Sequence, residues 1–230
     1  MQFFQRHLFI FLILLALVIS VVVFTKKNQP TTSQQDQQNQ LSPQPQNEIK
    51  DETIAPPKSS LVEPTPNFIA RITKKPFGIY VTPRDSPVAP EHFTGYHTGA
   101  DSEYDDVASD VVVNSIADGE VVLSRTAQGY GGVMVIRHLI NHNNYLVLYG
   151  HLEPKSMLQS GQKVSKGDKI GILGDAFTSE TDNERKHLHL AILKGERVDL
   201  RGYVQDQSQL DGWYNPKDFL EENFDGRIAK

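Results

Sequence analysis

Two histidines separated by a single leucine, His187 and His189, are the residues of this chain whose types and spacing best suit chemistry. They stand at the head of the run His-Leu-His-Leu-Ala-Ile-Leu, which predicts a β-strand. Because residues i and i+2 of a strand point to one face, both imidazoles would project together while Leu188 and Leu190 enter a core. Such a pair suits a metal site, where one imidazole binds the ion and the other handles protons. The alternative for this motif alone is a polar strand face with two solvated histidines.

Two further motifs supply residues of the same chemical kind. His97 and Asp101 lie in His-Thr-Gly-Ala-Asp, where Gly99 disfavours a regular helix, so we expect them to converge from a loop and an adjoining strand. His151 follows Tyr-Gly at the end of a predicted strand. Two histidines and one aspartate are a standard ligand set for catalytic Zn²⁺, and further histidines beside the metal could act as general base and oxyanion donor. Each motif alone has an ordinary structural explanation, but their joint occurrence predicts one site.

Composition narrows the chemistry further. The chain has no cysteine, so any metal site must be built from His, Asp and Glu. Its formal net charge of −5 argues against nucleic acid as the main partner, because binding to phosphates requires a basic surface. Histidines outside the three motifs are interpreted as structural or solvated: His7, His92, His138 and His142.

The elements that would position these residues are short strands between turn signals. Asp118-Gly119 between two β-branched runs predicts a hairpin, and residues 141–143 predict the turn of a second one. The series predicts an all-β, antiparallel sandwich or barrel, with helical turns only at 153–159 and 216–223. The predicted strands cover residues 111–117, 120–124, 131–138, 144–149, 161–164, 169–173 and 187–193.

These motifs together resemble the lysostaphin/LytM-type zinc metallopeptidases, a family of cell-wall endopeptidases. The family pattern is His-x-x-x-Asp, a central His at a strand end, and His-x-His. The resemblance covers about residues 95–220 and includes Ala-Asp-Gly-x-Val at 117–121, Gly-Tyr-Gly at 129–131 and Gly-x-x-Val-x-x-Gly-x-x-Ile-Gly at 161–171. It implies the barrel-sandwich domain of that family, with its duplicated hybrid motif.

By this resemblance, His97, Asp101 and His189 bind one Zn²⁺ per chain, and His151 and His187 are the catalytic pair. The resemblance also implies hydrolysis of peptide bonds in the stem peptides or cross-bridges of peptidoglycan. It does not say which of the two catalytic histidines is the general base, and it leaves any activator protein unidentified.

Two departures from the family pattern are local. The family has a short Gly/Ser/Thr-rich loop before His-x-His, whereas residues 176–186 (AFTSETDNERK) are longer and charged. Leu190-Ala191 replaces the Phe-Glu that often follows the histidine pair. Neither change removes a ligand, and the long loop bears on substrate specificity rather than on the chemistry. The acidic residues of this region are interpreted as a solvated loop: Asp175, Glu180, Asp182 and Glu184.

The N-terminal part of the chain predicts a membrane anchor and a linker. Leu8–Phe24 carries no charge, is apolar on all faces and spans roughly 25 Å as a helix, so it predicts a transmembrane segment within residues 1–27. It exceeds the usual length of a signal-peptide core and no Ala-x-Ala site follows it, which favours an anchor over a cleaved signal. Residues 28–66 are rich in Gln, Pro and Ser and predict a disordered linker, which leaves 67–230 as the globular domain.

Two indications oppose each other on the orientation of this anchor. Lys26 and Lys27 outnumber Arg6, which by the positive-inside rule argues against export of the segment that follows. The peptidoglycan substrate implied by the resemblance lies outside the membrane. We therefore expect a membrane-anchored chain whose catalytic domain is extracytoplasmic.

Three alternatives to an enzyme remain open at the level of sequence. Non-catalytic LytM-like regulators lose ligands, whereas this chain retains all five residues. A lipoyl- or biotinyl-like carrier, suggested by the repeat at 161–171, would need a modified Lys166 or Lys169. A tethered scaffold that binds glycan or partner proteins would keep its function after metal removal.

Overall fold

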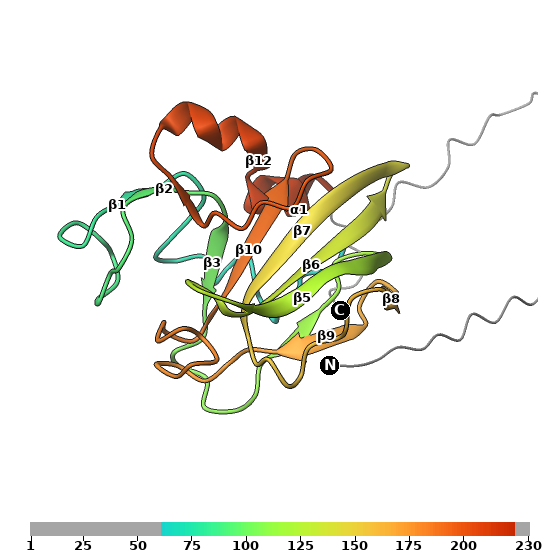
Figure 1. Ribbon diagram of the computed structural model, residues 1–230, viewed down its shortest axis with the longest axis horizontal. Helices are drawn as coiled ribbons and strands as arrows, with labels where there is room; N and C mark the ends of the chain where they lie inside the picture. The colour runs from blue at the N-terminus through green and yellow to red at the C-terminus, as the bar shows by residue number, and fades with distance from the viewer. Residues whose placement is uncertain (1–60, 224–230) are drawn as a thin grey trace, which may run out of the picture. The chain divides into compact units, whose positions relative to one another are not determined.

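The computed structural model describes residues 61–223, so the predicted membrane segment and most of the predicted linker lie outside it. The described residues fall within one compact unit and consist of strands with one α-helix and one 3₁₀ helix (Figure 1). Every strand pair among them is antiparallel, which confirms the prediction of an antiparallel all-β fold. The elements are β1 (Tyr80–Val81), β2 (Gly95–His97), β3 (Ala100–Glu103), β4 (Val112–Asn114), β5 (Gly119–Ala127), β6 (Gly131–Ile140), β7 (Asn143–Leu152), β8 (Lys163–Val164), β9 (Lys169–Ile172), β10 (His187–Leu193), β11 (Tyr203–Val204), η1 (Gln207–Gly212), β12 (Trp213–Tyr214) and α1 (Pro216–Asn223).

A seven-stranded main sheet carries most of the architecture. Its order is β12-β10-β7-β6-β5-β8, and β3 pairs with β10 along the same edge as β12. Figure 1 shows the long strands β5, β6, β7 and β10 side by side. Strands β6 and β7 form a hairpin whose two turn residues, Asn141 and His142, have positive φ angles of 49° and 66°, as a type I′ turn requires.

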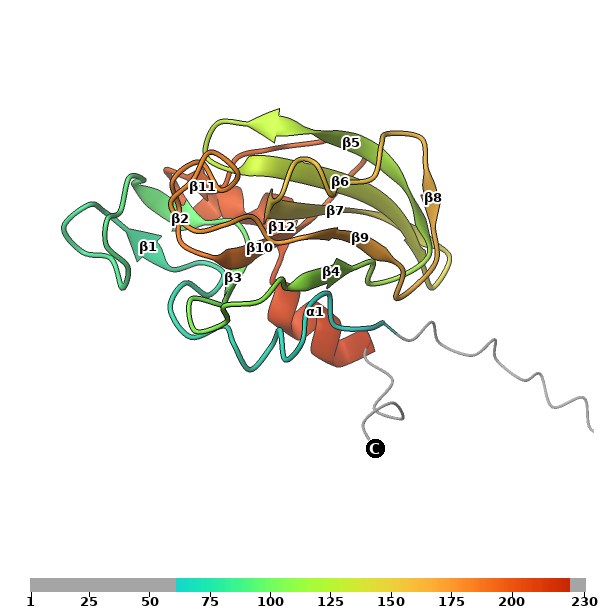
Figure 2. The ribbon, with the colours of Figure 1, turned by 90° about the horizontal axis from the view of Figure 1, so that it is seen from below.

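Both faces of the central strands are buried. Along β7, Val147 and Tyr149 face one hydrophobic core, while Leu146 and Leu148 face a second. The first core lies between the main sheet and a layer made by β4, β9 and α1, which Figure 2 shows on one side of the sheet. The second core lies under the segment that carries β11 and β12. Two covered faces explain why the strand sequences are continuously apolar rather than alternating.

The predicted hairpin at Asp118-Gly119 is wrong. Strand β4, which precedes it, pairs with β9 in a separate two-stranded sheet, whereas β5 pairs with β6 and β8. Between β4 and β5 the Ser115 N–H donates to the Asp168 carbonyl, and the Ser115 hydroxyl donates to the Ala117 carbonyl. The chain therefore turns from one layer into the other, because an Asp-Gly pair favours a turn without specifying which strands pair across it.

The folded domain begins before the predicted boundary at residue 67. Leu61 is 1% exposed, and its N–H donates to the carbonyl of Asn223 at the end of α1. The Val62 N–H donates to the Ile116 carbonyl. Residues 61–66, which composition assigned to the linker, therefore pack in the domain, because these contacts are with residues far away in the sequence.

The two predicted helical segments have different outcomes. Helix α1 forms at 216–223 and buries Phe219 and Leu220 against the first core. Residues 153–159 form turns instead of a helix, since the Ser156 hydroxyl donates to the Glu153 carbonyl and accepts from the N–H of Ile172 in β9. Within 61–223, no helix has the length and hydropathy needed to cross a membrane.

Candidate metal centre and active site

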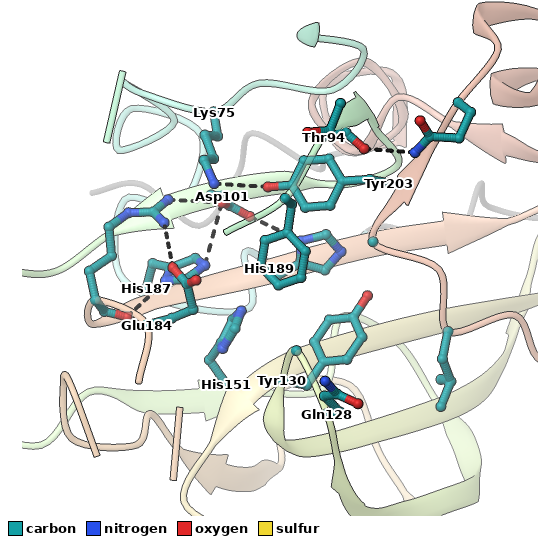
Figure 3. Close-up of a pocket in the computed structure, with 16 residues that line it drawn as sticks. Lys75, Thr94, Asp101, Gln128, Tyr130, His151, Glu184, His187, His189 and Tyr203 are labelled. Carbon is teal, nitrogen blue, oxygen red and sulfur yellow. Dashed lines mark hydrogen bonds and ion pairs between the residues drawn. The ribbon is translucent and has the colours of Figure 1, made fainter. Parts of the chain in front are cut away.

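Strand pairing brings the three motifs together at one end of the main sheet. β10 lies between β3 and β7, so His189 has Asp101 opposite it on one side and the end of β7, which carries His151, on the other. His97 is the last residue of β2, which is joined to β3 by a short connection. The structure thus places all five candidate residues in one site: His97, Asp101, His151, His187 and His189 (Figure 3).

His97, Asp101 and His189 form a compact triad of ligand atoms, all of them buried. Nε2 of His97 lies 3.0 Å from Nδ1 of His189 and 3.3 Å from Oδ1 of Asp101. Nδ1 of His189 lies 3.0 Å from the same carboxylate oxygen. Ligands about 2.0–2.2 Å from a zinc ion at tetrahedral angles are roughly 3.3–3.5 Å apart. The triad therefore fits a zinc-sized ion after small outward shifts.

Hydrogen bonding leaves a lone pair of His97 at the centre of this triad. Nδ1 of His97 lies 3.2 Å from the Pro76 carbonyl oxygen, which can only accept a hydrogen bond, so Nδ1 carries the proton. In the neutral ring, Nε2 of His97 is then an acceptor, and so is the Asp101 carboxylate. Both point at Nδ1 of His189, which can supply one proton at most. A convergence of nitrogen and carboxylate acceptors is the donor set that Zn²⁺ prefers.

Gly99 allows the connection between β2 and β3 to approach His189 closely. A Cβ at this position would lie 2.5 Å from the Leu190 carbonyl oxygen and 2.7 Å from Nε2 of His189. A larger residue would therefore force the imidazole of His189 or the backbone at Leu190 to shift. Gly99 thus disfavours a helix and also allows the close approach that positions the candidate ligand His189.

His151 and His187 lie beside the triad, with ring centroids 4.1 Å apart. Nδ1 of His151 donates to the Thr181 carbonyl at 3.1 Å, and Nδ1 of His187 donates to the Arg185 carbonyl at 2.8 Å. Both rings therefore keep a lone pair at Nε2, and that of His187 lies 3.4 Å from Oδ2 of Asp101. His151 also has a positive φ of 63°, a sparsely populated conformation that is common at functional sites.

Burial decides the charge of these groups. It lowers the pKa of His151 to about 3 and lowers the pKa of His187 well below its ordinary value, so both are neutral bases at neutral pH. Burial also lowers the pKa of His189. Burial by itself raises the pKa of the Asp101 carboxyl, but interactions with His97, His187 and His189 outweigh it and hold that pKa well below the usual value. The site thus combines a carboxylate with neutral imidazoles.

Arg185, which the sequence analysis did not select, holds the second oxygen of Asp101. Its Nη2 lies 2.8 Å from Oδ2 of Asp101 and 2.7 Å from Oε1 of Glu103, and its Nε lies 2.7 Å from Oε2 of Glu103. Burial opposes the charge of Arg185, but the two carboxylates raise its pKa above the ordinary value. The spacing of Asp101 and Glu103 could have indicated such a residue, because it places two acidic side chains on one face of a strand. Two buried carboxylates require a cation nearby.

The interpretation of the loop at 175–186 as solvated is wrong for Glu184, and Asp182 is only partly exposed. Glu184 is 6% exposed and lies beside Arg185 in the wall of the site. Asp182 accepts a hydrogen bond from the Gly129 N–H at 2.6 Å, which ties the loop to the turn before β6. The acidic composition suggested that these carboxylates contact water. Instead, Asp182 contacts a backbone N–H and Glu184 lies beside the buried guanidinium of Arg185.

A cavity of about 290 Å³ opens over the site (Figure 3). In its wall the Tyr130 hydroxyl is buried without a hydrogen-bond partner among the described residues, and the Tyr130 ring lies 5.4 Å from the ring of His189 and 5.6 Å from that of His151. Lys75 and Tyr203 line another part, with Nζ and hydroxyl 2.8 Å apart. The Gly-Tyr-Gly motif could have indicated Tyr130 from the sequence. No local pattern distinguishes Lys75 or Tyr203.

The other histidines lie outside the site. His138 is buried, with Nε2 3.0 Å from the Tyr149 hydroxyl, and burial lowers its pKa to about 4. His142 is exposed in the β6–β7 turn, and His92 is also exposed. His7 lies outside the described residues.

Comparison with known proteins connects this geometry to a family. Residues 95–200 match peptidase family M23. Over 86 residues the chain is 36% identical to the peptidoglycan DD-endopeptidase ShyA of Vibrio cholerae, a segment that covers 37% of this chain and 18% of that protein. The matched segment therefore represents less than a fifth of the length of that relative.

Several solved structures are also similar to this chain. LytU is 21% identical with a TM-score of 0.44, over 71% of this chain and 86% of LytU. Lysostaphin of Staphylococcus simulans, described as an antimicrobial peptidase, is 18% identical with a TM-score of 0.44, over 74% of this chain and 59% of that one. A chain of the pore-forming SpoIIQ–SpoIIIAH complex is 17% identical with a TM-score of 0.47, over 75% of this chain and 99% of that one. At these identities and TM-scores the likenesses carry no information about activity.

Proposed function

Because residues 95–200 of this chain belong to peptidase family M23, the LytM-type family that the sequence motifs indicated, we propose that the protein is a zinc-dependent endopeptidase of peptidoglycan. Its substrates are peptide bonds in the stem peptides or cross-bridges. The observation that carries the proposal is the convergence of the ligand atoms of His97, Asp101 and His189 beside two neutral imidazoles. Metal-assisted hydrolysis needs both parts, a metal site and a base within reach of it.

The triad would hold the ion through Nε2 of His97, Oδ1 of Asp101 and Nδ1 of His189. When bound, zinc supplies a Lewis acid that polarises the scissile carbonyl and acidifies a water molecule. The hydrogen bond from Arg185 to Oδ2 orients the Asp101 carboxylate, and the Pro76 carbonyl orients the His97 ring. The ligand atoms are therefore held in place before the ion arrives.

His151 and His187 are placed to move protons. Their Nδ1 atoms are occupied by the carbonyls of Thr181 and Arg185, so each ring can accept a proton only at Nε2. The histidine that takes the proton of the attacking water at Nε2 then carries that proton, and it donates it to the oxyanion or passes it on to the leaving amine, while the other neutral histidine orients the water through its Nε2 lone pair. The ring centroids are 4.1 Å apart, so both rings can reach the same reacting group, which supports a catalytic role for the pair.

Tyr130 supplies a further donor at the cavity wall. Burial raises the pKa of its hydroxyl, which keeps the proton in place at neutral pH. That hydroxyl has no partner among the described residues, and its ring packs near His151 and His189. A buried donor held ready in this way stabilises negative charge that develops on a substrate oxygen.

Zinc analysis and digestion of peptidoglycan test the proposal together. The purified full chain should contain about one zinc ion and should release products from purified peptidoglycan whose masses show new peptide termini. A chelator should abolish the digestion, and added Zn²⁺ should restore it. Bound zinc without cleavage would contradict the enzyme and support the non-catalytic regulator. A covalent adduct on Lys166 or Lys169 would support the carrier.

We further propose that the chain is anchored in the membrane, with the M23 domain on the extracytoplasmic side. The apolar run Leu8–Phe24 supports an anchor, and the location of peptidoglycan supports this orientation. Peptidoglycan peptides and the membrane are thus the two partners that the proposal names.

A further inference from the structure

Two neighbouring residues that line the cavity each have a buried polar atom with no hydrogen-bond partner among the described residues: Nη1 of Arg185 and Oε1 of Glu184. Both side chains are 7% exposed. Nη1 lies 3.7 Å from Oε2 of Glu184, which is an ion pair but too long for a hydrogen bond. The remaining donors Nε and Nη2 of Arg185 are already taken by Asp101 and Glu103.

A buried donor and a buried acceptor that stay unpaired both cost free energy, because each has lost its contact with water. They lie on adjacent residues of one loop and line the same cavity, so a single ligand group can satisfy both. That group must place an acceptor next to a donor. Because Glu184 and Arg185 have opposite charges, a neutral dipolar group suits the wall better than a free carboxylate or an ammonium group does.

We propose that Glu184 and Arg185 form a subsite that binds the backbone of one residue of an extended peptide substrate. The substrate carbonyl accepts from Nη1 of Arg185, and the N–H of the same residue donates to Oε1 of Glu184. In an extended chain, as in a β-strand, the N–H and C=O of one residue point to the same side. One substrate residue can therefore present both groups to the adjacent Glu184 and Arg185. The choice of a peptide as ligand rests on the proposed peptidase function.

The subsite lies next to the reacting centre. Arg185 also donates to Asp101 at 2.8 Å, and its carbonyl accepts from Nδ1 of His187 at 2.8 Å. Figure 3 shows Glu184 and His187 at one side of the cavity and Tyr130 at the other. A peptide held at this wall would therefore place a neighbouring peptide bond over the triad. The long loop that departs from the family pattern thus supplies a part of substrate recognition.

Peptide binding to the metal-free full chain tests the subsite without any need for hydrolysis. The probes are blocked trialanine peptides, made from L- and from D-alanine. Each is also made with one backbone N–H replaced by an ester oxygen. Dissociation constants are measured by NMR titration. In the parent protein, one ester position should weaken binding by roughly tenfold or more, because it removes a hydrogen bond to a carboxylate. In Glu184→Met the all-amide peptide should bind roughly tenfold more weakly, and the ester should cost nothing further.

Glu180→Met is the matched control. Glu180 belongs to the same loop, but its carboxylate accepts from the Asp175 N–H at 3.0 Å, and the residue does not line the cavity. It should keep the parent affinity and the parent response to the ester. Should Glu184→Met not fold, Glu184→Gln serves instead: its neutral amide oxygen is a weaker acceptor than a carboxylate, so the ester should cost less in Glu184→Gln than in the parent, and an equal cost would overturn the inference.

The inference is overturned if no trialanine peptide binds the parent protein, or if the ester costs the same in the parent and in Glu184→Met. Neither result depends on zinc or on catalysis. Failure of the proposed function would be seen separately, as absence of zinc or of peptidoglycan cleavage in the parent protein.

Discussion

Nη2 of Arg185 lies 2.8 Å from Oδ2 of Asp101, the carboxylate oxygen that faces away from His97 and His189. Arg185 belongs to the long charged loop before β10, whereas Asp101 belongs to β3. A residue of the loop thus orients a residue of the ligand triad. The loop is therefore part of the candidate metal centre as well as of the cavity wall.

The Arg185–Asp101 contact predicts an effect on zinc affinity. Arg185→Met should weaken zinc binding by roughly 10–100-fold, because the Asp101 carboxylate would no longer be held in one orientation. Competition with a chromophoric chelator measures this directly. Arg201→Met is the control, since Arg201 forms an exposed pair with Asp199 at 2.6 Å. Equal affinity in the parent and in Arg185→Met would show that the contact does not orient the ligand.

Zinc content should divide the five candidate residues into two classes. His97→Ala, Asp101→Ala and His189→Ala should each lose the ion, because each removes one of three candidate ligand atoms that lie 3.0 to 3.3 Å from one another. His151→Ala and His187→Ala should retain it. Metal analysis after dialysis decides the matter, and full occupancy in His189→Ala would mean that the ligand set is wrong.

The same two variants that retain zinc should lose activity. His151→Ala and His187→Ala should each lower the rate of peptide hydrolysis by roughly 10²-fold or more, because each removes a group for proton transfer or oxyanion stabilisation. The measurement is the release of products from soluble muropeptides at saturating zinc. His142→Ala, at an exposed turn position, is the control and should cleave at the parent rate. Rates near the parent value in both site variants would leave the mechanism without its base.

Buried His138 predicts a loss of stability in acid. Its pKa in the folded protein is about 4, below the ordinary value near 6.5, so the unfolded chain binds the proton first as pH falls. The stability that depends on neutral His138 is complete above about pH 6.5 and is lost between there and pH 4, to an extent of about 3 kcal/mol.

His138→Gln removes this titration and provides the comparison. With a chelator present, the advantage of the parent over His138→Gln in free energy of unfolding should shrink as pH falls from 7 to 4. Urea denaturation at several pH values gives these free energies. A difference that stays constant with pH would mean that His138 is not responsible for the acid sensitivity.

Protease accessibility tests the anchor and its orientation. The full chain should fractionate with membranes, and protease added to intact spheroplasts should cut between residues 28 and 60 and release a folded fragment. That fragment should cleave soluble muropeptides as the full chain does, because all five candidate residues lie between 97 and 189. Cleavage only after the membrane is opened would invert the topology, in agreement with Lys26 and Lys27, and would exclude a cell-wall substrate.

The candidate site residues could be selected from the sequence because their types and local spacing suggest metal binding and proton transfer. His-x-His on a strand places His187 and His189 on one face, and the structure has them on β10 as predicted. The turn at 141–143 and helix α1 were also predicted, since the preferences of residues for turns and helices act over a few residues. These features depend on short-range backbone preferences that the sequence carries directly.

Tertiary structure decided the features that depend on residues far apart in the chain. The pairing of β4 with β9 instead of β5, the burial of Leu61 against α1 and the insertion of Arg185 between Asp101 and Glu103 each require partners many residues away. From sequence, the charged loop before β10 was predicted to be solvated. Only the structure shows that its Arg185 is buried against the carboxylates of Asp101 and Glu103. The sequence thus determined which side chains can bind a metal and move protons, whereas only packing decided which groups orient them, because those contacts arise when distant segments exclude water together.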